Sequence, residues 1–286
     1  MTQMIIFKNA NQLSDYLFQK RNKQQQIGFV PTMGALHQGH HTLIITSVEA
    51  NDLTVCSIFV NPTQFNDTED FKKYPVTVEY DIKMLESAGC DILFLPPVSE
   101  IYPNGVHDLI TYDLGFLENV LEGEFRPGHF QGVCRVVHKL LEIVKPNRLY
   151  LGQKDYQQCM VIKKLLSLTK PDNQIKIEIA PTVREADGLA MSSRNKRLNA
   201  EARKNATEIS KALLFVKENI KKGETEDLIN TAFSHLSSKG FKIDYLKIAE
   251  AETLSEVNDW DGKLKIVVLA AAFVNEVRLI DNMLIN

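Results

Sequence analysis

The stretch F-V-P-T-M-G-A-L-H-Q-G-H-H-T-L, residues 29–43, decides the fold of this chain. Residues 27–30 are apolar and partly β-branched, which is typical of a buried strand, and Pro31 ends the strand because it has no N–H to donate. Two glycines then permit a tight turn, and from Leu43 onward apolar residues recur at helical spacing. The stretch therefore predicts a strand, a turn and a helix in succession.

Two histidines, His37 and His40, fall where the strand hands over to the helix. Ligands of α/β proteins bind at this end of a strand, and a helix N-terminus presents free N–H groups to anions. Imidazoles can donate to phosphate oxygens, which favours a nucleoside triphosphate that is attacked at its α-phosphate. G-x-x-x-x-G-K-[ST] and G-x-G-x-x-G do not occur in the sequence, which argues against a P-loop or dinucleotide site. A purely structural corner with two hydrogen-bonded histidines is the alternative.

The composition favours a small-molecule enzyme. A chain of 286 residues is long enough for one large or two modest domains. A net charge of −3 and an isoelectric point near 6.2 provide no basic field for nucleic acid or a membrane surface. The start M-T-Q-M-I-I-F-K has no signal-peptide pattern and no apolar run is long enough to span a bilayer, so we expect a cytoplasmic protein. Four cysteines without C-x-x-C spacing are expected to be buried thiols: Cys56, Cys90, Cys134 and Cys159.

Strands and helices alternate through residues 1–181. The expected strands span residues 27–30, 54–60, 91–95, 148–151 and 175–180, and the expected helices include 9–22 and 77–88. Such alternation implies right-handed crossovers and a parallel sheet covered on both faces. We therefore expect an α/β fold, a Rossmann-like doubly wound parallel sheet, in residues 1–181.

Two loops follow on the ligand side of the sheet. N-P-T-Q-F-N places Gln64, a donor and acceptor suited to a hydroxy acid, just after the strand 54–60, although spacing alone favours an ordinary loop glutamine. The first part of residues 67–80 is expected to be a flap over the pocket, with a solvated loop as the alternative. In the loop 122–133, Arg126 and His129 either face the pocket or steady the loop, and the bare sequence slightly favours the second interpretation.

The segment G-Q-K-D-Y-Q-Q comes directly after the strand 148–151. Gly152 permits close approach of the backbone to a ligand, Lys154 supplies a positive charge for phosphate, and Asp155 suits a ribose hydroxyl or a magnesium-bound water. Gln158 lies on the same helical face as Lys154. Considered without its neighbours, Lys154 would ordinarily be interpreted as a solvated surface lysine.

Residues 182–286 are expected to form a smaller α+β domain. The loop S-S-R, residues 192–194, has hydroxyls and a guanidinium that can hold β- and γ-phosphates, although a capping serine pair is the commoner interpretation. A long helix up to Gly223, a second from Thr225 to Gly240, and strands at 243–248 and 264–271 follow, with the last apolar run continuing toward 277–280. This domain shows no new catalytic set. We expect it to act as a lid that closes by hinge motion near residues 182–187.

Four motifs in the same order resemble one family across nearly the whole chain. P-T-M-G-A-L-H-Q-G-H, V-N-P-T-Q-F, G-Q-K-D-Y-Q-Q and S-S-R resemble the motifs of pantothenate synthetases, members of the H-x-G-H nucleotidyltransferase superfamily related to class I aminoacyl-tRNA synthetases. S-S-R looks like the family's counterpart of the K-M-S-K-S loop, with serine at the position of the first lysine. The loop 122–133 is also similar to the family's, which implies a place near the active-site wall or a subunit contact.

The resemblance implies a two-step reaction. Pantoate would attack the α-phosphorus of ATP to give pantoyl adenylate and pyrophosphate, and β-alanine would then displace AMP to give pantothenate. No side-chain nucleophile is needed, so positioning and electrostatics would supply the catalysis. Mg²⁺ would bridge the phosphates without an assigned protein ligand, and the protein would be a homodimer.

The resemblance also implies roles for individual residues. His37, His40, Lys154 and Arg194 would be catalytic, with His40 favoured as proton donor, and Gln64 and Gln158 would bind pantoate. The ATP-binding set would be Met33, Gly34, Ala35, Leu36, His37, Gln38, Gly39, His40, Gly152, Gln153, Lys154, Asp155, Val183, Met191, Ser192, Ser193 and Arg194. The alternatives are a nucleotidyltransferase that acts on a phosphorylated precursor, and a regulatory protein that binds ATP without chemistry.

Overall fold

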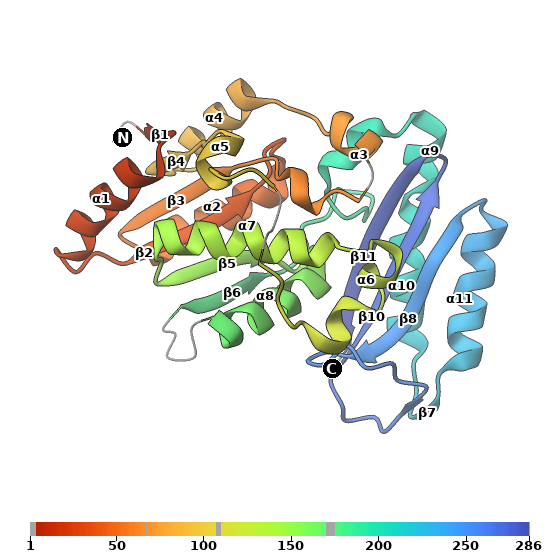
Figure 1. The fold of residues 1–286 in the computed structure, drawn as a ribbon. Helices are drawn as coiled ribbons and strands as arrows, with labels where there is room; N and C mark the ends of the chain where they lie inside the picture. Colours follow the sequence, from red (N-terminus) through yellow and green to blue (C-terminus); the bar gives the residue numbers. More distant parts are fainter. Residues whose placement is uncertain (1–3, 67, 107–109, 170–174, 286) are drawn as a thin grey trace.

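The computed structural model describes residues 4–66, 68–106, 110–169 and 175–285. A parallel sheet and an antiparallel sheet lie side by side, each with its own helices (Figure 1). Within the described residues, none of the helices is both long and apolar enough to cross a membrane. All four cysteines are buried free thiols, as predicted.

The first sheet has six parallel strands in the order β1-β4-β3-β2-β5-β6. The strands are β1 (Ile5–Phe7), β2 (Ile27–Thr32), β3 (Leu53–Ile58), β4 (Ile92–Phe94), β5 (Arg148–Gly152) and β6 (Lys176–Ala180). Successive strands run outward from β2 on one side and from β5 on the other, so the topological switch point lies between β2 and β5. The predicted Rossmann-like parallel sheet is confirmed, and its ligand crevice is expected at this switch point.

Helices cover both faces of the parallel sheet. They are α1 (Ala10–Arg21), α2 (Gln38–Ala50), α3 (Thr68–Lys72), α4 (Val78–Ser87), α5 (Val98–Ile101), α6 (Glu122–Phe125), α7 (His129–Val144) and α8 (Tyr156–Thr169), with short 3₁₀ turns η1 (Pro62–Gln64), η2 (Gly115–Glu118) and η3 (Gln153–Asp155). Alternate strand residues face opposite sides: Phe29 packs with α1, α7 and α8, whereas Val30 packs with α2 and α4. Both faces of β2 are therefore buried, which explains its continuous apolar run.

The C-terminal part has a three-stranded antiparallel sheet in the order β11-β10-β8 (Figure 1). Its elements are η4 (Ser193–Arg197), α9 (Ala200–Asn205), α10 (Thr207–Asn219), β7 (Gly223–Glu224), α11 (Glu226–Ser238), β8 (Lys242–Glu250), β9 (Asp259–Trp260), β10 (Ile266–Val274) and β11 (Val277–Ile285). One face of the sheet packs on α10 and α11. The other face, with Tyr245, Val267 and Leu269, joins the core formed by α7 and α8. The two sheets therefore share one continuous core.

Several expectations about the elements were wrong. β2 continues through Pro31, which was expected to end it, to Thr32, and the strand β1 was not predicted. α7 begins at His129, inside the segment expected to be a loop up to residue 133. The long helix expected after Asn199 is divided into α9 and α10 at Ala206. The last apolar run is a third strand, because Asn275 adopts a left-handed conformation (φ 51°) in a two-residue turn that pairs β10 with β11.

Candidate active site

A cavity of about 220 Å³ opens at the carboxyl ends of β2 and β5, between the parallel sheet and the S-S-R loop. Most of the residues predicted for the site lie around it. From that set, it is lined by Met33, His37, Gly39, His40, Gln64, Gly152, Lys154, Asp155, Gln158, Val183, Met191, Ser192, Ser193 and Arg194. Four motifs that are far apart in the sequence therefore meet at the switch point of the sheet.

The turn between β2 and α2 is fixed by a buried carboxylate that the sequence analysis did not identify. Asp81 of α4 accepts hydrogen bonds from the backbone N–H groups of Ala35 (2.9 Å) and Leu36 (2.8 Å). Gly34 has φ +79°, and a Cβ there would lie 3.0 Å from Asp81 Oδ2. Asp81 thus determines the path of the chain that leads into the H-x-G-H motif.

Several residues predicted to bind ATP are not among the residues that line this cavity. Ala35 and Leu36 have their side chains in the core and their N–H groups on Asp81. Gln38 lies at the surface, within 3.3 Å of His41, and Gln153 donates to Asn282 at 3.2 Å. Gly34 lies in the turn itself and lines a neighbouring cavity. Their placement favours roles in positioning the loops.

His37 and His40 are fixed to the first turn of α2 by their own backbone. His37 Nδ1 accepts from the Gly39 N–H at 3.2 Å, and His40 Nδ1 accepts from the His37 N–H at 3.3 Å. The ring centroids are 4.1 Å apart. A neutral imidazole whose Nδ1 accepts a hydrogen bond carries its proton on Nε2. Both histidines therefore offer an Nε2–H donor at the cavity that they line.

Both histidines are held in the neutral form. Burial lowers the pKa of His37 to about 2, and the positive charges of Lys154 and Lys196, and that of His40 when it is protonated, act in the same direction. Burial also lowers the pKa of His40 to about 4, with Asp155 opposing this shift and Lys154 adding to it. At neutral pH the two rings therefore act as uncharged donors.

Gln64 also lines the cavity and is buried. Its Oε1 accepts from Asn61 Nδ2 at 3.1 Å, and its Nε2 lies 2.7 Å from the sulfur of Met33. Asn61 Nδ2 also donates to the Gly132 carbonyl at 3.0 Å. The carboxamide is therefore held in place before any ligand arrives.

Helix α7 presses directly against the loop that carries Gln64. A Cβ on Gly132 would lie 2.1 Å from the Thr63 carbonyl oxygen and 2.5 Å from Gln64 Cα, so the helix and the loop approach this closely only because residue 132 is glycine. The buried His129 Nδ1 lies 2.8 Å from the Gln64 carbonyl and donates to it. His129 thus steadies the loop that carries Gln64, whereas the sequence analysis expected it either to face the pocket or to steady its own loop 122–133.

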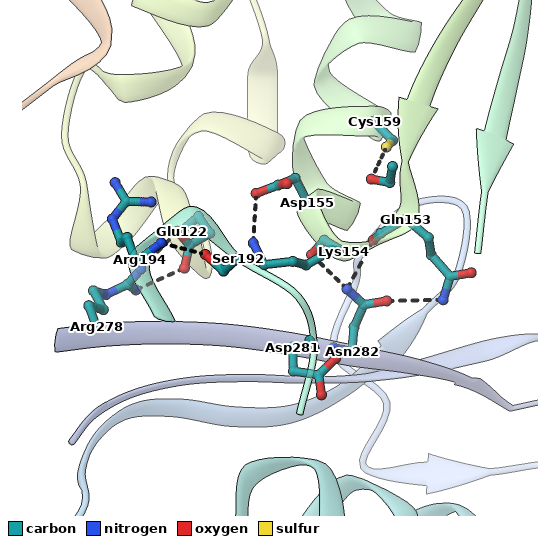
Figure 2. Close-up of polar contacts among 12 residues, drawn as sticks. Glu122, Gln153, Lys154, Asp155, Cys159, Ser192, Arg194, Arg278, Asp281 and Asn282 are labelled. Atoms are coloured by element: carbon teal, nitrogen blue, oxygen red, sulfur yellow. Dashed lines mark hydrogen bonds and ion pairs between the residues drawn. The ribbon is translucent and has the colours of Figure 1, made fainter. Parts of the chain in front are cut away.

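A residue of the C-terminal strand β11 fixes the backbone at Lys154. Asn282 Nδ2 donates to the backbone carbonyls of Gln153 (3.0 Å) and Lys154 (2.9 Å), and Figure 2 shows Asn282 reaching from β11 to this turn. Lys154 Nζ lies 3.5 Å from Asp155 Oδ1. The C-terminal part therefore contributes more to the site than the sequence analysis expected. The adjacent D-N pair inside the apolar strand V-R-L-I-D-N-M-L-I was the available signal.

A second cavity of about 350 Å³ adjoins the first and shares with it Lys154, Asp155, Ser192 and Arg194. In this cavity Arg194 Nη2 lies 2.8 Å from Asp70 Oδ2, and Arg197 Nη1 lies 2.8 Å from Asp70 Oδ1. Arg194, expected to hold phosphate, is thus paired with α3. Residue 67, the start of the expected flap, lies outside the described residues.

A buried ionic cluster borders the second cavity on the side of β11. Glu122 Oε2 accepts from Arg278 Nη1 at 2.9 Å (Figure 2). Glu122 Oε1 accepts from the Tyr245 hydroxyl at 2.9 Å. Arg126 Nη1 lies 3.4 Å from Glu122, and Arg278 Nε donates to Asp244 at 2.7 Å. Burial raises the pKa of Glu122, but the hydrogen bonds and charges of Arg278 and Arg126 outweigh it and lower the pKa to about 2. Arg126 therefore both lines the cavity and steadies α6.

The residues that the structure describes contain no group of three His, Cys, Asp or Glu side chains that is placed to hold a metal ion.

The fold and the cavities define a class: an α/β protein with a Rossmann-like sheet, in which an H-x-G-H turn and an S-S-R loop face one polar cavity. The model of one protein family, Pantoate-beta-alanine ligase, matches residues 5–284. The chain belongs to this family and is an enzyme of it, as the resemblance of the four motifs predicted.

Curated relatives agree in length as well as in sequence. The chain is 46% identical over 286 residues to the pantothenate synthetase of Cytophaga hutchinsonii, and the match covers 99% of both chains. It is 45% identical over 285 residues to that of Fervidobacterium nodosum, and this match covers 99% of this chain and 100% of the relative.

Solved structures show the same architecture. The crystal structure of pantothenate synthetase from Thermus thermophilus matches with a TM-score of 0.88 at 38% identity, and the match covers 98% of this chain and 99% of that one. The pantoate-beta-alanine ligase from Francisella tularensis, complexed with beta-gamma ATP and beta-alanine, matches with a TM-score of 0.80 at 41% identity, and the match covers 98% of this chain and 97% of that one.

Proposed function

We propose that this enzyme condenses pantoate with β-alanine at the expense of ATP, through a pantoyl adenylate, and releases AMP and pyrophosphate. The observation that carries the proposal is the convergence of His37, His40, Lys154 and Arg194 with Gln64 and Gln158 around adjoining cavities. The Francisella tularensis relative, solved with beta-gamma ATP and beta-alanine, supports the choice of substrates.

In the first step, the pantoate carboxylate attacks the α-phosphorus of ATP and pyrophosphate leaves. The neutral Nε2–H groups of His37 and His40 donate to the oxygens on which charge develops, while Lys154 supplies a fixed positive charge. The low pKa values of the two histidines make them hydrogen-bond donors rather than acids, which refines the proton-donor role expected for His40. Ser192, Ser193 and Arg194 hold the β- and γ-phosphates.

In the second step, the amine of β-alanine attacks the acyl carbon of the mixed anhydride and AMP leaves. Gln64 and Gln158 hold pantoate in both steps, because an uncharged carboxamide can bind its hydroxyl groups without attracting or repelling the carboxylate. The fixed position of Gln64 on Asn61 supports this role, since a preorganised group loses little entropy on binding.

Mg²⁺, when bound, would supply positive charge to the phosphates of ATP, and Asp155, which lines both cavities, is the residue that would hold it through a bound water. The division at residues 181 and 182, the lid motion of the C-terminal part, the homodimer and the cytoplasmic location stay predictions from the sequence.

The test is isotope exchange between pyrophosphate and ATP in the presence of pantoate. His40→Ala is expected to lower the exchange rate by about 10²-fold or more, because it removes a donor to developing charge. His41→Ala is the matched control, since His41 lies at the surface beside Gln38 and does not line the cavity. Exchange near the wild-type rate in His40→Ala would remove His40 from this role. Exchange that does not depend on pantoate would contradict the proposed reaction.

A further inference from the structure

One carboxylate joins α3 to the S-S-R loop. Asp70 accepts from Arg194 through Oδ2 and from Arg197 through Oδ1, each at 2.8 Å. Burial raises the pKa of Asp70, but the two guanidinium groups outweigh it and hold the pKa of this carboxyl below its usual value. Asp70 is therefore an anion at neutral pH, and it engages both arginines at once.

The carboxylate occupies a place suited to a phosphate group. Asp70 lines the 350 Å³ cavity together with Lys154, Ser192 and Arg194, which are the groups proposed to hold the phosphates of ATP. A carboxylate and a phosphate bind guanidinium in the same way, through pairs of N–H···O bonds. An ATP molecule whose α-phosphate lies at His37 and His40 would extend its other phosphates toward this pair of arginines.

The ion pairs of Asp70 with Arg194 and Arg197 are exposed enough to be broken by a ligand. The side chains of Asp70, Arg194 and Arg197 are each about a quarter exposed, so solvent screens the ion pairs. Helix α3 has only five residues, and in Figure 1 it projects from the parallel sheet toward α9. Aromatic contacts of Phe65 with Phe71 (5.2 Å) and Tyr74 (5.8 Å) pack the chain on either side of Asp70.

We propose that Asp70 is an internal competitor at the phosphate-binding arginines: it occupies Arg194 and Arg197 as an anion, and a ligand with a polyphosphate chain must displace it to reach them. The proposal rests on the phosphate-binding role of Arg194 in the proposed function. A triphosphate carries several charges and reaches both arginines, whereas the single phosphate of AMP stays at the histidines. Asp70 thus weakens the binding of each polyphosphate ligand by a constant factor and leaves the binding of AMP unchanged.

The experiment compares three ligands by titration calorimetry on the full chain: ATP, inorganic pyrophosphate and AMP. Asp70→Asn is expected to bind ATP and pyrophosphate about threefold to tenfold more tightly, because the competing anion is removed, and to bind AMP within about twofold of the wild type. Asp70→Glu retains the anion and should return ATP affinity toward the wild-type value. Glu79→Gln, an exposed acid on α4, controls for the change in net charge.

Three outcomes would overturn the proposal. Weaker ATP binding in Asp70→Asn would mean that Asp70 orients Arg194 for the nucleotide instead of competing with it. If Asp70→Asn bound AMP more tightly by the same factor as ATP, or if Glu79→Gln bound ATP more tightly by that factor, the gain in affinity would come from the change in net charge and not from a competing anion. Unchanged affinity for all three ligands would show that Asp70 does not compete. Pantoate-dependent exchange in the wild type tests the proposed function separately, because it does not depend on the affinity ratio of the variants.

Discussion

The same chemical unit, one carboxylate between two arginines, occurs twice at the border of the second cavity. The first is the buried ionic cluster that joins α6 to β11, the buried joint, in which Glu122 lies between Arg126 and Arg278. Its side chains are 9–18% exposed. The second is the link between α3 and the S-S-R loop, the flap contact, in which Asp70 lies between Arg194 and Arg197. Its side chains are 23–25% exposed. The difference in burial, and the extra hydrogen bond from Tyr245 to Glu122, separate a permanent connection from one that a ligand can replace.

Burial changes the consequence of losing a partner. In the joint, a guanidinium from β11 satisfies a carboxylate from α6, so the joint ties the C-terminal sheet to the other part of the molecule. Removing one member leaves an uncompensated charge away from water. At the flap contact, water can take over from the lost partner. Motion of the C-terminal part as a whole would have to open the joint, whereas motion of α3 would not.

The largest expected effect is therefore on the joint. Arg278→Ala is expected to lower the free energy of unfolding by about 3–5 kcal/mol, because Glu122 keeps only the longer contact with Arg126 (3.4 Å) and the Tyr245 hydroxyl. Urea unfolding followed by circular dichroism measures this loss.

Lys247→Ala is the matched control for Arg278→Ala. Lys247 pairs with Glu256 at 2.8 Å on the same C-terminal sheet, but the two side chains are 42% and 47% exposed. Its loss is expected to change the free energy of unfolding by less than about 1 kcal/mol. Equal losses in the two variants would contradict the distinction between buried and exposed ion pairs in this protein.

The next effect is on acid stability, to which His129 beside the joint contributes together with His37 and His40, whose pKa values are also lowered, to about 2 and about 4. His129 lies 3.1 Å from Arg126, and burial together with that charge lowers the pKa of His129 to about 3 from 6.5. Below pH 6.5 the unfolded chain binds a proton that the folded chain does not, so the stability falls as the pH falls from 6.5 toward 3. Glu122, with a pKa of about 2 against 4.5, adds a loss only below pH 4.5.

His129→Asn separates these two windows. The variant retains a donor for the Gln64 carbonyl but does not titrate, so its stability should fall less than that of the wild type between pH 7 and pH 5, by about 1–2 kcal/mol. Urea unfolding at the two pH values measures the difference. The same pH dependence in both proteins would show that His129 is not the group that titrates.

The sequence was sufficient for five of the six parallel strands, all but the short edge strand β1, and for the parts of the site that adjoin them. Buried strands appear as continuous apolar runs, and their carboxyl ends share one edge of the sheet, so His40, Gln64 and Lys154 could be grouped without coordinates. The position of these residues at the strand ends did not identify the reaction or the role of each residue, and these were inferred from the family resemblance.

The sequence was not sufficient for partners that meet only through tertiary structure. Asp81 and Arg278 look like ordinary charged residues of an amphipathic helix and of a strand, and nothing local shows that one receives the amides of a distant turn or that the other satisfies Glu122. Gly132 is similar, because the approach of α7 to Thr63 depends on the packing of a whole helix. These contacts have no sequence spacing from which to predict them.

The smallest expected effect completes the comparison at the flap contact. Asp70→Asn is expected to change the free energy of unfolding by less than about 1 kcal/mol, because partly exposed ion pairs contribute little and asparagine still offers an acceptor to one arginine. Urea unfolding of the protein without ligand measures the change beside Arg278→Ala. A loss as large as that of Arg278→Ala would mean that Asp70 holds the fold together, and a carboxylate with that task would be too costly for ATP to displace.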